Sequence, residues 1–137
     1  AWMLLALALG VATWVAGFDV FYSLQDVDFD RSERLQSLPA ALGEEGSIRI
    51  ARVLHAISIA SLGVVGFAVN AGPWYWVGAA LAGLLLVYEH SLVRPGNLSR
   101  LDAAFFTMNG MISIAFFFFV LIDRMTRATA FGGRLLQ

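Results

Sequence analysis

Residues 56–87 read AISIASLGVVGFAVNAGPWYWVGAALAGLLLV, an apolar stretch without a charged side chain. A transmembrane helix needs about 20 mostly apolar residues, so this stretch is long enough for two. It is interrupted at residues 70–73 (NAGP), a turn signal, and the next residues, 74–76 (WYW), are aromatic types enriched at membrane interfaces. The stretch therefore predicts two membrane-spanning helices joined by a tight turn.

Two more charge-free stretches lie on either side of this pair, at residues 1–18 and 103–122. Of the 137 residues, 59% are hydrophobic and 14% are charged, against roughly 25% charged in a soluble domain. The sequence predicts an all-α membrane protein with one domain over residues 1–137. Its four transmembrane helices are expected at about 2–24, 49–69, 74–92 and 103–123, with a polar cap at 25–48.

Charge and cysteine content narrow the possible functions. The net charge is −1 and the chain contains nine basic residues, all arginine, which are spread over connectors and the tail and form no basic surface for nucleic acid. The absence of cysteine excludes disulfides, thiolate metal sites and a cysteine nucleophile. Oxygen ligands remain available for a metal.

The arginines are distributed unequally among the connectors. The turn between the second and third spans carries no charge, and the tail carries Arg124, Arg127 and Arg134. The other two connectors lie on one side of the membrane and hold the remaining arginines: Arg31, Arg34, Arg49, Arg52, Arg94 and Arg100. By the positive-inside rule this side is cytoplasmic, although the tail partly violates the rule. We therefore expect a multi-pass protein of the cell inner membrane.

Residues 37–43 (SLPAALG) predict a short helix with proline in its first turn and glycine at its end. The helix is too short to span a membrane. Together with the acidic residues before it, it is expected to cover the cytoplasmic mouth of the bundle.

Residues 17–31 (GFDVFYSLQDVDFDR) carry most of the chemistry that the sequence offers. If the first helix continues through them, four side chains are spaced i, i+3, i+7 and i+11 and share one face. We call this set the acidic face: Asp19, Tyr22, Asp26 and Asp30. Asp28 is expected to lie off it.

Aligned carboxylates at a membrane boundary repel one another unless a positive charge lies among them. A divalent cation provides that charge, and Mg²⁺ prefers carboxylate oxygens shared with a substrate phosphate. The spacing therefore favours a metal site that handles a diphosphate. The competing interpretation is a solvated helix end without a ligand, which the position of Asp19 inside an apolar helix makes less favourable.

These residues resemble the second aspartate-rich motif of the UbiA superfamily of intramembrane prenyltransferases. The resemblance rests on Tyr22-x-x-x-Asp26-x-x-x-Asp30, preceded by Gly17-Phe18-Asp19 and followed by Ser37-Leu38-Pro39. Residues 88–95 (YEHSLVRP) and 103–110 (AAFFTMNG) are similar to the last connector and last helix of members that act on 4-hydroxybenzoate or a related acid. The match covers essentially the whole chain.

The resemblance implies a nine-helix bundle in which two aspartate-rich motifs hold a diphosphate through Mg²⁺. This chain would supply the last four helices, and the first motif would lie on an earlier helix. The implied metal ligands are Asp26 and Asp30, with Tyr22 as a further catalytic residue. The lysine that often follows the second motif is missing, so the implied substrate-binding residues are Asp19, Arg31, Arg34 and Gln36.

The implied reaction is Mg²⁺-dependent transfer of a polyprenyl group from polyprenyl diphosphate to an aromatic acceptor such as 4-hydroxybenzoate, in ubiquinone or menaquinone biosynthesis. A naphthoate or lipid acceptor is the alternative within the superfamily. The chain begins at Ala1 inside an apolar helix pattern, which predicts a fragment. Because one aspartate motif cannot hold the diphosphate from both sides, the fragment is expected to be inactive alone.

Five other polar residues admit simpler interpretations. His55 is expected to be a packed, hydrogen-bonded residue, Asn109 to join two helices, and Asp102 to cap a helix. Glu89 and His90 lie at a helix end, where a salt-bridged loop and a contact with the acidic face explain them equally well.

Two rival functions remain. A CDP-alcohol phosphotransferase also uses intramembrane aspartates and metal, but its D-G-x-x-A-R opening is absent because Val20 follows Asp19. A transporter or channel subunit with an acidic ion site would place its acids near the middle of the membrane, whereas these lie at one membrane face.

Overall fold

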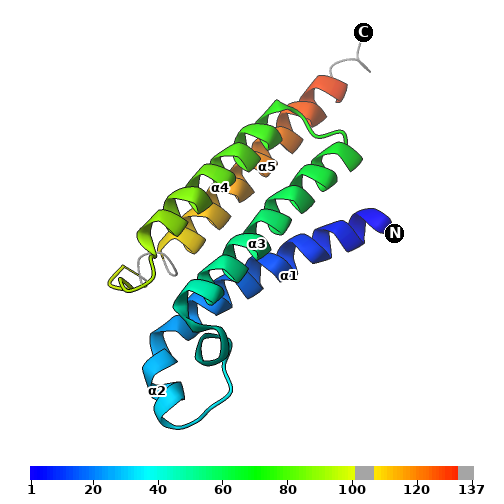
Figure 1. Cartoon of the computed structure of the whole chain (residues 1–137). Helices are drawn as coiled ribbons and strands as arrows, with labels where there is room; N and C mark the ends of the chain where they lie inside the picture. Colours follow the sequence, from blue (N-terminus) through cyan, green and yellow to red (C-terminus); the bar gives the residue numbers. More distant parts are fainter. Residues whose placement is uncertain (101–106, 133–137) are drawn as a thin grey trace.

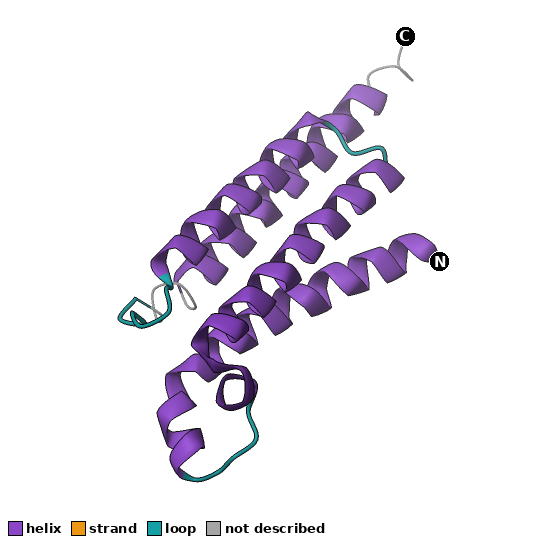
Figure 2. Ribbon diagram, in the orientation of Figure 1, coloured by secondary structure: helices purple, strands orange, loops and turns teal. Residues whose placement is uncertain are grey.

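The computed structural model describes residues 1–100 and 107–132. The described part contains α1 (Trp2–Ser23), the 3₁₀ turn η1 (Leu24–Asp26), α2 (Val27–Ser32), α3 (Leu38–Ala68), α4 (Pro73–Leu92) and α5 (Asn109–Gly132). The four long helices run alternately up and down and lie beside one another (Figure 1). Figure 2 shows helix continuing past α1 into α2, a loop from α2 to α3, and a second loop from α3 to α4. The predicted all-α architecture is confirmed.

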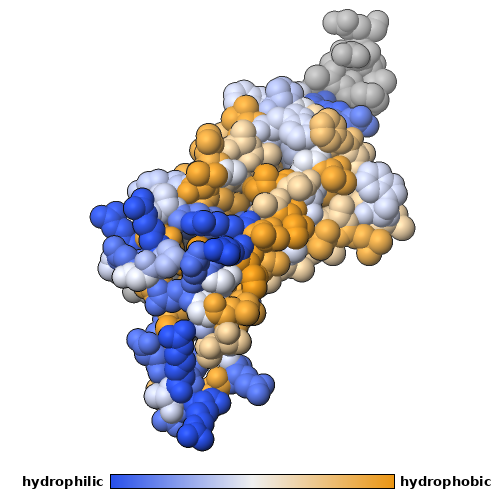
Figure 3. Space-filling model, viewed as in Figure 1, coloured by the Kyte–Doolittle hydropathy of each residue, from blue (hydrophilic) through white to orange (hydrophobic). Residues whose placement is uncertain are grey.

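The four predicted spans correspond to α1, α3, α4 and α5, with shifts at two ends. α3 begins at Leu38, where the sequence predicted a cap, and α5 continues to Gly132 beyond the predicted end at residue 123. By length and hydropathy alone, the helical segments that are apolar enough to cross a membrane in the described part are Trp2–Ser32 and Leu38–Ala68. Hydrophilic residues gather at the end of the molecule that holds α2, whereas the body is mostly hydrophobic (Figure 3).

α1 packs against α3 through small residues that let the two backbones approach closely. Ser58 donates a hydrogen bond from Oγ to the carbonyl of Gly10 at 2.8 Å. At Gly17 the ring of His55 lies so close that an added Cβ would meet it at 2.3 Å. Small residues at helix contacts are typical of membrane bundles, where association depends on close packing rather than on water exclusion.

The contact between α1 and α5 combines an apolar cluster with one polar bond. Trp14 donates a hydrogen bond from Nε1 to Oδ1 of Asn109 at 3.0 Å, which confirms the prediction that Asn109 joins two helices. The apolar core beside this bond contains residues of α1, α4 and the start of the last helix: Phe18, Ala82, Leu86, Met108 and Ile112. Asp102, predicted to cap that helix, lies outside the described residues.

The turn between α3 and α4 is fastened by a buried aspartate that no sequence pattern indicated. Asp123 of α5 is 1% exposed and accepts hydrogen bonds from the backbone N–H of Gly72 at 3.0 Å and of Tyr75 at 3.3 Å. Gly72 is the N-cap residue of α4 and Tyr75 lies in its first turn, where helical partners are absent and a negative charge is favoured. A side chain from another helix thus caps α4.

The predicted short helix at 37–43 is confirmed as the first turns of α3. The backbone N–H of Ala40 donates to Ser37 Oγ at 3.3 Å, and Pro39 lies in the first turn. Gly43 interrupts the helix with φ 73° and ψ 175°, a left-handed φ that glycine adopts without the usual steric cost. Beyond this kink Glu44 accepts a hydrogen bond from the N–H of Gly96 at 2.7 Å, which ties the cap to the loop after α4.

Candidate functional site

The acidic face lies where α1 ends, and the backbone there differs from the prediction. A regular helix was expected through residue 30, but α1 stops at Ser23, tightens into η1 and resumes as α2. Asp26 is the point of change, with φ −103° and ψ 8°. A 3₁₀ turn rotates each residue by about 120° rather than 100°, so Asp26 and Asp30 are rotated relative to Asp19. The prediction of one uninterrupted helix through residue 30 is therefore wrong.

The two sides of the segment at residues 18–30 differ in burial. Four apolar residues spaced three apart are buried against the rest of the chain: Phe18, Phe21, Leu24 and Val27. Asp19, Tyr22 and Asp26 are exposed, and Asp30 is half-buried. Asp28 is exposed as well, so burial does not distinguish it from the acidic face. Asp19, Tyr22 and Asp26 therefore lie on the exposed side of a segment whose other side is packed and apolar.

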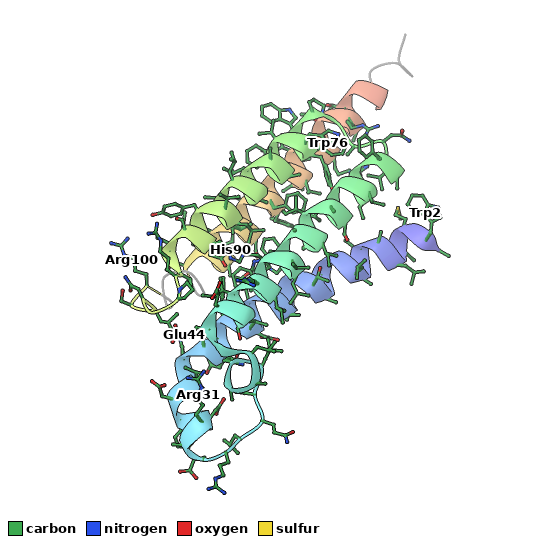
Figure 4. The ribbon with its side chains drawn as sticks, in the orientation of Figure 1. Trp2, Arg31, Glu44, Trp76, His90 and Arg100 are labelled. Carbon is green, nitrogen blue, oxygen red and sulfur yellow. The ribbon has the colours of Figure 1, made fainter. Side chains whose placement is uncertain are left out.

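The candidate diphosphate-binding residues after the aspartates are all exposed. Arg31 lies in the last turn of α2, on the cap that Figure 4 shows at one end of the molecule. Arg34 follows α2 in the left-handed conformation with φ 55°, which is uncommon for a residue with a side chain. Gln36 is in the extended segment before α3. The structure places these side chains near one end, and among the described residues no ion pair joins Arg31 or Arg34 to an aspartate of the acidic face.

The donor set of the acidic face fits a hard divalent cation. Among the described residues the ion pair is Arg49 with Glu45, so Asp19, Asp26 and Asp30 have no cationic partner within that part of the chain. Mg²⁺ is usually bound by one or two carboxylates together with substrate phosphate and water, and exposed carboxylate oxygens can supply the protein's share of such a site. The residues Asp26 and Asp30 are suited to hold such an ion.

A second feature is a groove of about 1030 Å³ between α3 and α4. Its wall is mainly apolar, with Arg52, His55, His90 and Ser91 as its polar members. The acidic face does not line it. The groove and the acidic face are therefore separate features of the described chain.

His55, Glu89 and His90 form a group at the groove that we call the buried cluster. His55 is 2% exposed and Glu89 is 0% exposed. His55 Nδ1 lies 2.9 Å from His90 Nε2, which confirms that His55 is packed and hydrogen-bonded. The salt-bridged loop expected for Glu89 is not found, because no ion pair to Glu89 is present among the described residues. The sequence did not predict this contact between the histidines, because 35 residues separate them.

An all-helical bundle with exposed hydrophobic side chains along its body and carboxylates at one end defines a polytopic membrane protein. The chain belongs to the UbiA prenyltransferase family, whose family model matches residues 1–122. This confirms the resemblance found in the aspartate motif and the two downstream segments.

Curated relatives and a solved structure agree with the family. The 4-hydroxybenzoate octaprenyltransferase of Chromohalobacter salexigens is 30% identical over 105 residues, covering 77% of this chain and 34% of the relative. That of Aromatoleum aromaticum is 25% identical over 116 residues, covering 85% and 38%. A UbiA homolog from Aeropyrum pernix K1, solved in its apo form, superposes with a TM-score of 0.73 at 31% identity, covering 90% of this chain and 42% of that one. The chain thus spans about a third of the length of these curated relatives.

Proposed function

We propose that the chain is the C-terminal part of an aromatic prenyltransferase that moves a polyprenyl group from polyprenyl diphosphate to a small aromatic acceptor such as 4-hydroxybenzoate. The observation that carries the proposal is the exposed, uncompensated acidic face on a chain of this family. The names of the relatives support the choice of acceptor class. Quinone biosynthesis is the corresponding pathway, and ubiquinone or menaquinone the product class.

Within this proposal the residues of the chain bind and position the diphosphate. Mg²⁺, when bound, neutralises the departing diphosphate so that the allylic carbon–oxygen bond ionises. Asp26 and Asp30 would hold the ion, and Asp19 would orient them or act through a bound water. Tyr22, with 49% of its surface exposed, offers a hydroxyl to the diphosphate and a ring face to the allylic cation.

Arg31, Arg34 and Gln36 supply the remaining contacts to the diphosphate. A guanidinium donates paired N–H bonds to phosphate oxygens and stays charged at every relevant pH. The left-handed backbone of Arg34 is a local cost that a binding role would explain. These two arginines take the place of the missing lysine.

The proposal also covers where the protein lies in the cell. The helix-rich, apolar body lies in the cell inner membrane, and the cap with the acidic face lies on the cytoplasmic side, as the distribution of arginines predicts. Residues 1–137 alone are expected to be inactive, because one aspartate motif contacts the diphosphate from one side only. Prenyl transfer by the purified 137-residue chain with Mg²⁺ would refute this last point.

The test is turnover by Asp26→Asn and Asp30→Asn in the full-length protein in membranes, with polyprenyl diphosphate, 4-hydroxybenzoate and Mg²⁺. Each variant removes one negative charge at the metal, and we expect turnover to fall by about 10²–10³-fold, the scale of losing one preorganised electrostatic contact. Asp28→Asn is the matched control and should keep most activity. Equal loss in all three variants, or parental turnover in the first two, would contradict the assignment.

A further inference from the structure

The buried cluster lies apart from the acidic face and has no part in the proposed transfer. Its members come from two helices, His55 from α3 and Glu89 and His90 from the end of α4. One donor atom from each residue lies within 4.8 Å of the others. In Figure 4, His90 lies within the bundle, whereas Arg31 lies out on the cap.

Four polar atoms of the buried cluster lack a hydrogen bond of good geometry in the described structure: His55 Nε2, Glu89 Oε1, Glu89 Oε2 and His90 Nδ1. The backbone of Trp14 lies close enough to His55 to interact with it, so the Glu89 oxygens and His90 Nδ1 are the clearest orphans. The contact between the two rings uses one N–H and one lone pair, since a neutral imidazole has one of each. Whichever ring donates, one N–H and one lone pair are left over, along with both carboxylate oxygens. Buried polar groups are nearly always satisfied, so this arrangement indicates a missing partner.

The side chains around the cluster do not supply that partner. Phe18 and Phe21 of α1 pack against the rings, with centroids 4.7 Å from His55 and 4.9 Å from His90 respectively. Gly17 leaves room for the His55 ring where any larger residue would collide with it. Arg52, an exposed residue on the groove wall, forms no ion pair with Glu89 among the described residues.

We propose that His55, Glu89 and His90 bind a divalent transition-metal ion, with Zn²⁺ as the best fit. Two imidazole nitrogens and one carboxylate oxygen are a donor set of zinc sites that keep an open position. With bonds of about 2.1 Å, a tetrahedral ion separates its ligand atoms by about 3.4 Å. The observed separations, 2.9 Å between the ring nitrogens and at most 4.8 Å overall, bracket that value.

An ion at this place would lie against the two nitrogens of the ring contact, His55 Nδ1 and His90 Nε2, and beside the orphaned Glu89 carboxylate, and it would leave His55 Nε2 and His90 Nδ1 as N–H donors. The histidines would ligate through lone pairs, which requires the direct ring contact to open slightly. The buried Glu89 carboxylate would gain the positive partner that it lacks. His55 and His90 both line the groove, which gives the ion an entry path and turns the fourth position toward the open space. Nitrogen donors distinguish this site from the all-oxygen acidic face, which favours Mg²⁺.

The experiment uses the full-length protein in nanodiscs, stripped with a chelator and titrated with Co²⁺ in excess Mg²⁺. Co²⁺ replaces Zn²⁺ and reports a four-coordinate site by its visible absorption. We expect a stoichiometric signal that Zn²⁺ displaces, and at least a tenfold loss of affinity in Glu89→Gln and His90→Gln. The double variant Asp26→Asn/Asp30→Asn should bind Co²⁺ like the parent, so the result does not depend on prenyl transfer.

A variant of matched size and a measurement of Tm separate loss of metal binding from misfolding. Glu89→Gln keeps the size of the side chain, and the apparent Tm of each variant without metal shows whether it has folded. A parental protein without a displaceable Co²⁺ signal would overturn the proposal. So would folded Glu89→Gln and His90→Gln variants that both bind Co²⁺ with parental affinity.

Discussion

The acidic face and the buried cluster present opposite physical situations within one chain. The face carries exposed carboxylates without counter-charges, supported from behind by Phe18, Phe21 and their neighbours. The cluster carries a fully buried carboxylate and two imidazoles that are enclosed by α1, α3 and α4. An exposed charge costs the fold little and is free to bind, whereas a buried unpartnered charge costs stability until something binds it.

This difference predicts opposite responses to substitution. At the acidic face, removing a charge should reduce function and leave the free energy of unfolding nearly unchanged. In the buried cluster, a change of charge or volume should alter the free energy of unfolding directly. Substitutions at each place therefore separate residues that bind a ligand from residues that also shape the fold.

The largest effect on stability is expected from Gly17→Ala. An added Cβ would lie 2.3 Å from the His55 ring, so the ring or one of the two helices must move. Overpacking of this kind costs roughly 2–3 kcal/mol, and it should also displace His55 from Glu89 and His90. The measurement is the free energy of unfolding in mild detergent, followed by Co²⁺ titration.

Gly83→Ala is the matched control, because an added Cβ there would approach its nearest neighbour, on Ile59, at 4.0 Å. Its effect on the free energy of unfolding should be much smaller than the effect of Gly17→Ala. Similar losses in the two variants would show that the Gly17 contact is not tight.

A smaller change of opposite sign is expected from Glu89→Met without metal. The substitution keeps an unbranched side chain of similar length and removes two buried oxygens that have no hydrogen-bond partner. Releasing that desolvation penalty should raise the free energy of unfolding by about 1–2 kcal/mol. The gain should vanish when Zn²⁺ is present, since only the parental protein binds it. Destabilisation of the metal-free variant would mean that Glu89 already has a partner.

The hydrogen bond between Trp14 and Asn109 gives a reference value for an ordinary polar contact in this bundle. Trp14→Phe removes the Nε1 donor that lies 3.0 Å from Asn109 Oδ1 and keeps an aromatic ring. Interhelical hydrogen bonds in membrane proteins average about 0.6 kcal/mol, so we expect a loss of that size. Chemical unfolding in detergent checks it, and a loss above that of Gly17→Ala would reverse the expected order.

The smallest effect is expected at the acidic face itself. Asp26→Asn relieves repulsion with Asp30, worth about 0.2–0.5 kcal/mol for exposed residues four apart. The unliganded variant should therefore be as stable as the parent or slightly more so. A clear loss of stability would show that Asp26 has a structural role at the start of α2.

The sequence predicted the parts of this molecule that depend on local pattern. The paired spans around residues 70–73, the proline and glycine of the short helix before the Gly43 kink, and the family motif were all readable because neighbouring residues decide them. The 3₁₀ turn that ends at Asp26 could not be predicted in this way. The apolar residues Phe18, Phe21, Leu24 and Val27 are spaced three apart and buried on one side, and which of them are buried is known only once the helices are packed.

Contacts between residues far apart in the chain could not be predicted from the sequence pattern. The cap of α4 by Asp123 and the meeting of His55 with His90 each join residues far apart in the chain. Each histidine or acid, taken alone, had an adequate local explanation. Their shared burial without partners became visible only when the helices were placed together.

The central claim is that the acidic face binds diphosphate through Mg²⁺, and direct binding tests it without the chemistry. The measurement is calorimetric titration of the full-length protein with geranyl thiodiphosphate, an analogue that reacts slowly, with and without Mg²⁺. The parental protein and Asp28→Asn should bind it only with Mg²⁺, and Asp26→Asn/Asp30→Asn should bind it at least a hundredfold more weakly. Binding of parental strength by that double variant, or binding that is unaffected by removal of Mg²⁺, would contradict the account.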